Sequence, residues 1–119
     1  MTESGTLRGG ELNAAVTSAL VGIHNAHLGR GPKTASTFYQ GNVIVTLMQD
    51  VMTRAERTLA LTGNAAAVTN MRHLFQEAMQ TEFTNAVERL SGRTVVAFIS
   101  GNHVDPDMAA EVFVLDAEL

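Results

Sequence analysis

Apolar residues recur along the chain at two different spacings, and these spacings predict its helices and strands. Residues 11–28 and 64–90 place apolar side chains three or four positions apart, which is typical of amphipathic helices. A glycine follows each segment, Gly29 or Gly92, as is common where helices end. The stripes predicted to be buried are Leu12, Val16, Leu20 and Ile23 in the first helix, and Val68, Met71, Phe75, Ala78, Met79, Ala86 and Leu90 in the second.

Strand-forming residues gather in four shorter segments. Gly41 and Asn42 separate two runs rich in Thr, Phe, Tyr, Val and Ile, which predicts a hairpin. The two later segments are joined by residues 102–110, which contain Asp105 and Pro106 and are predicted to be a loop. The predicted strands are residues 35–40, 43–49, 93–101 and 111–117.

A short helix is predicted between the hairpin and the second long helix. Thr53 and Glu56 have the spacing of a capping box, in which each residue bonds the backbone amide of the other, and Gly63 ends the helix. The element order is therefore α-β-β-α-α-β-β. This order predicts an α+β fold, with a four-stranded antiparallel sheet and helices mainly on one face.

Both faces of the predicted sheet carry apolar side chains. Three helices are too few to cover both faces, so something else must cover the second one, and self-association would do so. The alternation predicts one face with Val96, Phe98, Phe113 and Leu115, and the opposite face with Val95, Ile99, Val112 and Val114.

Length and composition restrict the class of protein. With 119 residues, we predict a flexible N-terminus over residues 1–9 and a single domain over residues 10–119. The net charge of −4 argues against nucleic-acid binding, and the absence of cysteine excludes disulfides and thiolate metal sites. Neither a signal peptide nor a run of about 18 apolar residues is found, so we expect a cytoplasmic protein without direct membrane insertion.

The sequence Gly-Arg-Gly-Pro-Lys after the first helix gathers two cations on one short loop. Arg30, Gly31 and Lys33 are candidates for binding an anion or a protein partner. The spacing does not match a phosphate-binding P-loop, and the loop follows the negative end of a helix. A structural alternative is therefore open, in which Arg30 and Lys33 neutralise that helix end.

Histidines and charged helix residues supply further candidates. Helical spacing puts His27 in the middle of the first apolar stripe and His24 at its edge, so both are predicted to be core or interface residues. A metal site that also uses His103 and Asp105 is a less favoured alternative. No catalytic residue, metal or cofactor is predicted, because no nucleophile motif is present.

Arg72 and Glu82 both project onto the apolar stripe of the second long helix. They lie about 15 Å apart along the helix axis, so they cannot pair with each other. A buried charge without a partner is strongly unfavourable. We therefore predict that each takes part in a separate buried or interface ion pair.

Several short motifs follow one another in a fixed order along the chain. They are Gly29 to Lys33; Thr53, Glu56 and Leu59; Val87, Glu88, Leu90, Gly92 and Arg93; Phe98 and Ser100; and Glu111 to Leu115. In their order and spacing these motifs resemble the MpsC-like family, described as the C subunit of a sodium-translocating, membrane-potential-generating system. The resemblance spans about residue 10 to the end, with Met52 where leucine is usual and Ser91 where threonine is usual.

The resemblance implies a non-enzymatic accessory protein of a membrane system linked to ion movement or inorganic-carbon supply. Together with the two apolar faces of the predicted sheet, the resemblance leads to the hypothesis of a homo-oligomer that reaches the membrane through an integral membrane partner. One alternative is a sensor that binds bicarbonate or phosphate through Arg30, Lys33 and the loop amides. A metal-dependent enzyme built from His24, His27, His103 and Asp105 is a third, less favoured hypothesis.

Overall fold

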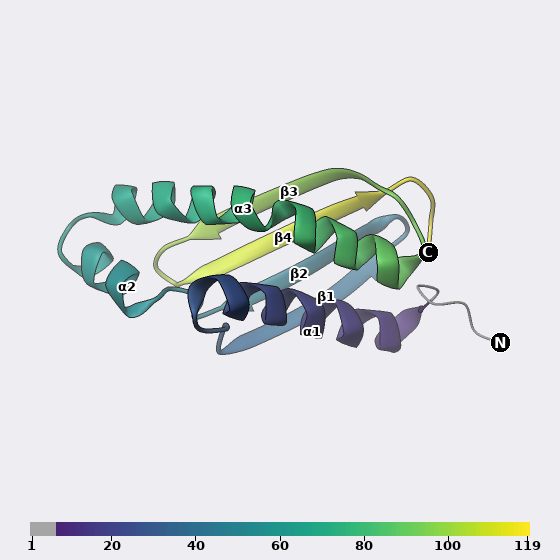
Figure 1. Ribbon diagram of the computed structural model, residues 1–119, viewed down its shortest axis with the longest axis horizontal. Coiled ribbons are helices and arrows are strands. Elements are labelled where there is room, and N and C mark those ends of the chain that lie inside the picture. Colours follow the sequence, from purple (N-terminus) through teal and green to yellow (C-terminus); the bar gives the residue numbers. More distant parts are fainter. Residues whose placement is uncertain (1–6) are drawn as a thin grey trace.

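The computed structural model describes residues 7–119, which form three helices and four strands in the predicted order (Figure 1). The strands form one antiparallel sheet, in the order β1-β2-β4-β3. The predicted α+β fold is therefore confirmed. The elements are α1 (Gly9–Leu28), β1 (Thr34–Gln40), β2 (Val43–Gln49), α2 (Arg54–Leu61), α3 (Ala65–Ser91), β3 (Val95–His103) and β4 (Met108–Leu115).

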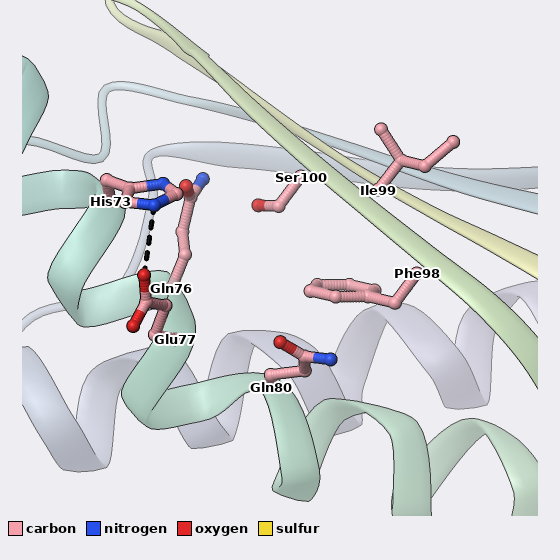
Figure 2. Close-up of a pocket in the computed structure, with 7 residues that line it drawn as sticks. All are labelled: His73, Gln76, Glu77, Gln80, Phe98, Ile99 and Ser100. Carbon is pink, nitrogen blue, oxygen red and sulfur yellow. Dashed lines mark ion pairs between the residues drawn. The ribbon is translucent and has the colours of Figure 1, made fainter.

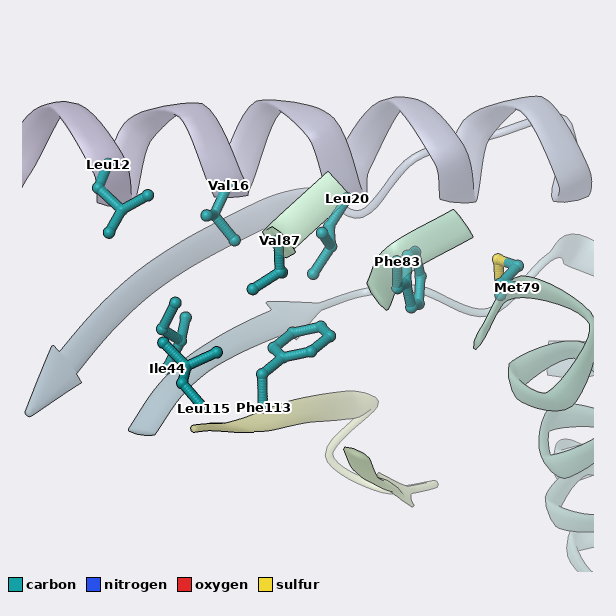
Figure 3. Packing of buried hydrophobic residues seen from close by; sticks show 9 residues of the cluster. All are labelled: Leu12, Val16, Leu20, Ile44, Met79, Phe83, Val87, Phe113 and Leu115. Atoms are coloured by element: carbon teal, nitrogen blue, oxygen red, sulfur yellow. The ribbon is translucent and has the colours of Figure 1, made fainter. Parts of the chain in front are cut away.

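The core lies between the sheet and the two long helices. Helices α1 and α3 lie side by side across one face of the sheet, and α2 lies beyond one end of it (Figure 1). Burying each large apolar side chain contributes roughly 1.5–3 kcal/mol, so this layer is the main source of stability. The central cluster is Leu12, Val16, Leu20, Ile44, Met79, Phe83, Val87, Phe113 and Leu115 (Figure 3).

The glycines and the capping box found in the sequence lie at helix ends, as predicted. Gly29 and Gly92 adopt left-handed backbone angles, with φ of 77° and 71°, directly after α1 and α3. The Thr53 hydroxyl accepts a hydrogen bond from the Glu56 amide, and the Glu56 carboxylate accepts one from the Thr53 amide. The predicted capping box is thus confirmed. Among residues 7–119, no helix is both long enough and apolar enough to cross a bilayer.

The last two strands reach closer to each other along the chain than predicted. Residues 102–110 were predicted to be a loop, but Asn102 pairs with Ala109 and His103 pairs with Met108. Only a four-residue turn, 104–107, separates β3 from β4. The prediction of a long loop was wrong because ladder hydrogen bonds to a neighbouring strand outweigh the weak strand preference of Gly and Asn.

An irregularity in β3 also changes which side chains share a face. The pairing of β3 with β4 shifts between Val95 and Ala97, as it does at a β-bulge. Val95 therefore packs against the core with Phe98, whereas Val96 is 61% exposed on the opposite face. The regular alternation that grouped Val96 with Phe98 was wrong, because one extra residue reverses the pattern before the bulge.

The N-terminal end of the described chain is attached to the end of α3. The Leu7 amide donates to the Leu90 carbonyl, and the Arg8 guanidinium donates to the Ser91 carbonyl. Of the predicted flexible N-terminus, residues 1–6 lie outside the described residues. Helix α1 begins at Gly9, directly after these two contacts.

Candidate functional site

Arg30 joins the loop after α1 to the segment between β2 and α2. Its guanidinium donates to the main-chain carbonyls of Met52 at 2.7 Å and Asp50 at 3.0 Å, and its Nε contacts the Gly31 carbonyl at 3.4 Å. Gly31 packs closely on α1, since an added Cβ would lie 3.3 Å from a Val21 methyl group. The guanidinium is therefore committed to carbonyl oxygens, which leaves Lys33 as the exposed cation of the loop.

The two histidines of α1 exchange the positions that helical spacing predicted. His24 is 2% exposed and continues the buried line of Val16 and Leu20, whereas the His27 side chain is 35% exposed. His27 contacts Glu82 of α3 through its Nε2 atom. The prediction of a core or interface residue is confirmed for His24. The placement of His27 in the middle of the stripe was wrong, because the buried positions of α1 follow steps of four residues, from Leu12 to His24.

The two charges predicted on the stripe of α3 have different surroundings. Arg72 is 5% exposed, and its Nε lies 3.2 Å from Glu56 Oε2 of α2. The Glu82 side chain is 54% exposed, so its predicted place on the buried stripe was wrong. Glu82 lies at the edge of the stripe, where its contact with His27 joins the surfaces of α1 and α3.

Arg72 lies at the centre of a buried polar network, defined here as His24, Glu56, Arg72, Ser100, Asn102 and Glu111. Arg72 Nη1 donates to Asn102 Oδ1 at 3.4 Å, and its charge influences the pKa values of both His24 and Glu111. The Arg72–Glu56 pair is close enough for strong attraction, although its atoms are not aligned as a hydrogen bond. Arg72 Nη2 and His24 Nε2 are buried without a partner.

Glu111 brings a buried carboxyl group from β4 into this network. It is 2% exposed and accepts a hydrogen bond from the Ser100 hydroxyl of β3. Burial raises its pKa to about 7, while the Ser100 hydrogen bond and the Arg72 charge act in the opposite direction. Burial likewise lowers the pKa of His24. The network therefore contains two titratable groups whose pKa values are shifted by burial, and the pKa of Glu111 lies near neutral pH.

A pocket of about 300 Å³ opens between α3 and β3, next to the network (Figure 2). Phe98 and Ser100 point from β3 towards Gln76 and Gln80 of α3, while Ile99 points away (Figure 2). Gln76 is 7% exposed, and its Nε2 atom is buried without a partner. At the mouth, exposed His73 and Glu77 form an ion pair at 2.9 Å.

A larger pocket, of about 510 Å³, lies at the α2 end of the molecule and is called the acidic pocket below. Asp50, Asp105, Asp107 and Arg57 are among the residues that line it, as is Leu61, which is 81% exposed. Apolar wall comes from Met52, Ala60, Val104 and Pro106. Arg30 donates to the main-chain carbonyls of Asp50 and Met52, and both of these residues line the pocket. The Gly-Arg-Gly-Pro-Lys loop therefore helps to hold this part of the pocket in place.

The residues of the metal hypothesis are not brought together. His24 contacts the Arg30 carbonyl, His27 contacts Glu82, and His103 contacts the Pro106 carbonyl. Within residues 7–119, no group of three His, Asp or Glu side chains is placed to hold a metal ion. The arrangement therefore gives the metal-dependent hypothesis no support.

The face of the sheet opposite the helices is apolar and open. Phe38 pairs with Val45, Val45 with Val112, and Val112 with Ile99, so an apolar row crosses all four strands. Phe38 and Ile99 are 51% and 60% exposed. No Asp, Glu, Lys or Arg occupies an outward-facing strand position. The outer sheet face, as it is called below, consists mainly of Ser36, Phe38, Val43, Val45, Leu47, Val96, Ile99, Ala110, Val112 and Val114.

Sequence reasoning identified Arg72 and the Thr53–Glu56 cap, but it missed the part played by Glu111. The signal was present, because Glu111 has the same strand parity as Phe113 and Leu115, which point into the core. The partnership of Glu56 with Arg72 had no such signal, since it joins two helices that are separated by a turn.

Comparison with known proteins identifies a family that the chain matches. A family model described as the Na⁺-translocating membrane potential-generating system protein MpsC matches residues 8–117 of the 119 residues. No curated protein and no solved structure shows a significant match.

Proposed function

The chain belongs to the MpsC family, and from this premise we propose that it is a non-enzymatic accessory protein of a membrane system that moves ions. In this proposal it works at the cytoplasmic side, associates with a second copy of itself, and docks on an integral membrane protein. The observation that carries the proposal is the outer sheet face, an apolar surface that the protein's own helices leave uncovered.

A second copy of the chain is the occupant that best fits the outer sheet face. A face without charged residues has nothing to select a charged partner, whereas an apolar row across four strands is complementary to itself around a two-fold axis. Four strands about 4.8 Å apart and about 24 Å long present roughly 450 Å² per copy. Two copies would bury about 900 Å², slightly below the usual lower limit for specific complexes. We therefore expect a weak dimer.

Replacing Ile99 with lysine should abolish this self-association. Ile99 lies in the apolar row on the edge strand β3, so a lysine there would bring an unpaired charge against the apolar face of the second copy, which is unfavourable. The wild-type protein should show a dimer with a dissociation constant of about 1–100 µM in sedimentation velocity, whereas Ile99→Lys should remain monomeric.

Leu74→Lys is the matched control for this experiment. Leu74 is 64% exposed, close to the 60% of Ile99, but it lies on α3 and away from the outer sheet face. The control variant should dimerise like the wild type. A wild-type protein that stays monomeric at several hundred micromolar, or a dimer that is unaffected by Ile99→Lys, would contradict the proposed interface.

Docking on a membrane protein is tested through Lys33, the exposed cation of the loop. Because Arg30 bonds three carbonyls, changing it would disturb the fold, so the variant is Lys33→Glu with Arg30 kept. A tagged copy should retain a specific integral membrane protein from detergent-solubilised native membranes, and Lys33→Glu should lose most of it. Arg89→Glu, an equivalent charge reversal on exposed α3 surface, should retain it. If neither protein retains a membrane component, the docking proposal fails.

A further inference from the structure

The charges of the acidic pocket are not balanced by its own residues. Asp50, Asp105 and Asp107 supply three carboxylates, and Arg57 is the one cation that lines the pocket. Arg57 Nη2 lies 3.7 Å from Asp107 Oδ2 and 3.9 Å from Asp50 Oδ1. Both distances exceed the 2.7–2.9 Å or so of a charge-assisted hydrogen bond. Arg57 therefore lies near two carboxylates but forms a hydrogen bond of normal length with neither.

Asp107 is the residue that points most directly to a missing partner. Its side chain is 6% exposed, and its Oδ2 accepts a hydrogen bond from the Met52 amide at 2.9 Å. Its Oδ1 is buried and accepts no hydrogen bond. A buried acceptor without a donor is unfavourable, so Asp107, which is one of the residues lining the pocket, still lacks one hydrogen-bond donor.

The shape of the pocket selects an organic cation. Among residues 7–119, no group of three His, Asp or Glu side chains is placed to hold a metal ion. The carboxylates of the pocket therefore do not form a metal site. The pocket has about 510 Å³ of space and an apolar wall that includes Met52, Val104 and Pro106. Arginine and lysine side chains combine a charged end with an apolar stem that packs on such a wall.

We propose that the acidic pocket receives an arginine or lysine side chain of the docking partner, and that an adjacent apolar residue of the partner covers Leu61. Leu61 lines the pocket but is 81% exposed, so a single basic side chain in the pocket would leave it in water. A segment with a basic residue next to an apolar one satisfies both surfaces. This inference rests on the proposed docking function and adds the chemistry of the contact.

The direct test uses the dipeptide acetyl-leucyl-arginine amide as a probe. Its control is the same dipeptide with citrulline, which has the shape of arginine but no charge. In ¹⁵N-edited NMR titrations, the arginine probe should shift the amides of Asp50, Leu61 and Asp107, and should bind about tenfold or more tightly than the citrulline probe. Absence of localised shifts, or equal binding of the two probes, would overturn the inference.

Asp50→Asn with Asp105→Asn removes two pocket charges while keeping Asp107, whose hydrogen bond to Met52 supports the fold. Asn tolerates the left-handed backbone of Asp50, where φ is 56°, so the double variant should fold. It should bind the arginine probe at least tenfold more weakly. Glu77→Gln, an exposed carboxylate outside the acidic pocket, should leave the affinity unchanged.

Capture from native membranes separates this inference from the docking proposal. If the wild type retains a membrane protein and the Asp50→Asn, Asp105→Asn variant loses it, the pocket is a docking contact. If both retain it equally, docking stands and the pocket inference is overturned. If even the wild type retains nothing, the docking function fails, and with it the assignment of the pocket to a partner, whatever the probe shows.

Discussion

Replacing Arg72 with methionine is expected to destabilise the protein by about 3–5 kcal/mol, the range found when a buried ion pair loses one partner. Methionine fills a similar volume, so little of the loss would come from a cavity. The loss comes from Glu56, which is 1% exposed and would be left as a buried carboxylate facing no cation. In urea denaturation at pH 7 the midpoint should fall strongly, and the melting temperature should drop by roughly 10–20 °C.

A second change should recover most of that loss. In Arg72→Met with Glu56→Gln, the buried charge is removed, while the glutamine oxygen can still accept the hydrogen bond from the Thr53 amide. The single Glu56→Gln variant completes the double-mutant cycle. Arg89→Met, on the exposed side of the same helix, should change stability by less than about 0.5 kcal/mol. If the double variant is as unstable as Arg72→Met alone, the Arg72–Glu56 pair is not the source of the effect.

Replacing Glu111 with glutamine is expected to change how stability depends on pH. The folded pKa of about 7 lies above the ordinary value of 4.5 because burial disfavours the charged carboxylate. The folded state therefore binds the proton more tightly than the unfolded state. The resulting stabilisation is fully present below pH 4.5 and is lost as the pH rises through about 7; a shift of this size corresponds to about 3 kcal/mol.

Glutamine resembles the protonated acid and can still accept the hydrogen bond from Ser100. The free energy of unfolding of Glu111→Gln, relative to the wild type, should thus increase by about 3 kcal/mol between pH 4.5 and 8. His24 has a lowered pKa, so its contribution is present above about pH 6.5 and is lost as the pH falls. His24 and Glu111 thus change the free energy of unfolding with pH in opposite directions. The difference in unfolding free energy between the wild type and Glu111→Gln is therefore more informative than the pH curve of either protein alone.

The measurement is urea denaturation of both proteins at half-unit intervals from pH 4.5 to 8. His24 contributes equally to the two curves and cancels in their difference. Glu77→Gln is the control, because Glu77 is exposed on α3, and its difference from the wild type should vary little with pH. Parallel curves for the wild type and Glu111→Gln would show that Glu111 titrates in the folded protein as it does in the unfolded chain.

Local patterns were sufficient to predict the elements and their order. Helix ends at Gly29 and Gly92 and the Thr53–Glu56 cap depend on residues within a few positions of one another, so their physics is present in the sequence. The same holds for the apolar character of both sheet faces. The α+β fold followed because one order of elements allows few ways of covering a single sheet.

Tertiary structure decided which residues meet across the fold. The exchange of His24 and His27, the bulge before Phe98, and the extension of β3 into a nominal loop all depend on the twist and pairing of the sheet. The contacts of Arg30 with Asp50 and Met52 could not be predicted from the sequence either, because they join a loop to a linker about twenty residues further along the chain.

The site follows the same division. The sequence alone identified the uncovered apolar face and the charges that need partners, because alternation and helical spacing show where side chains point. It did not identify Glu56 as the partner of Arg72, nor the three aspartates as walls of one pocket. A partner is chosen by distance in three dimensions, and that distance is set by how helices and strands pack rather than by any local preference of the chain.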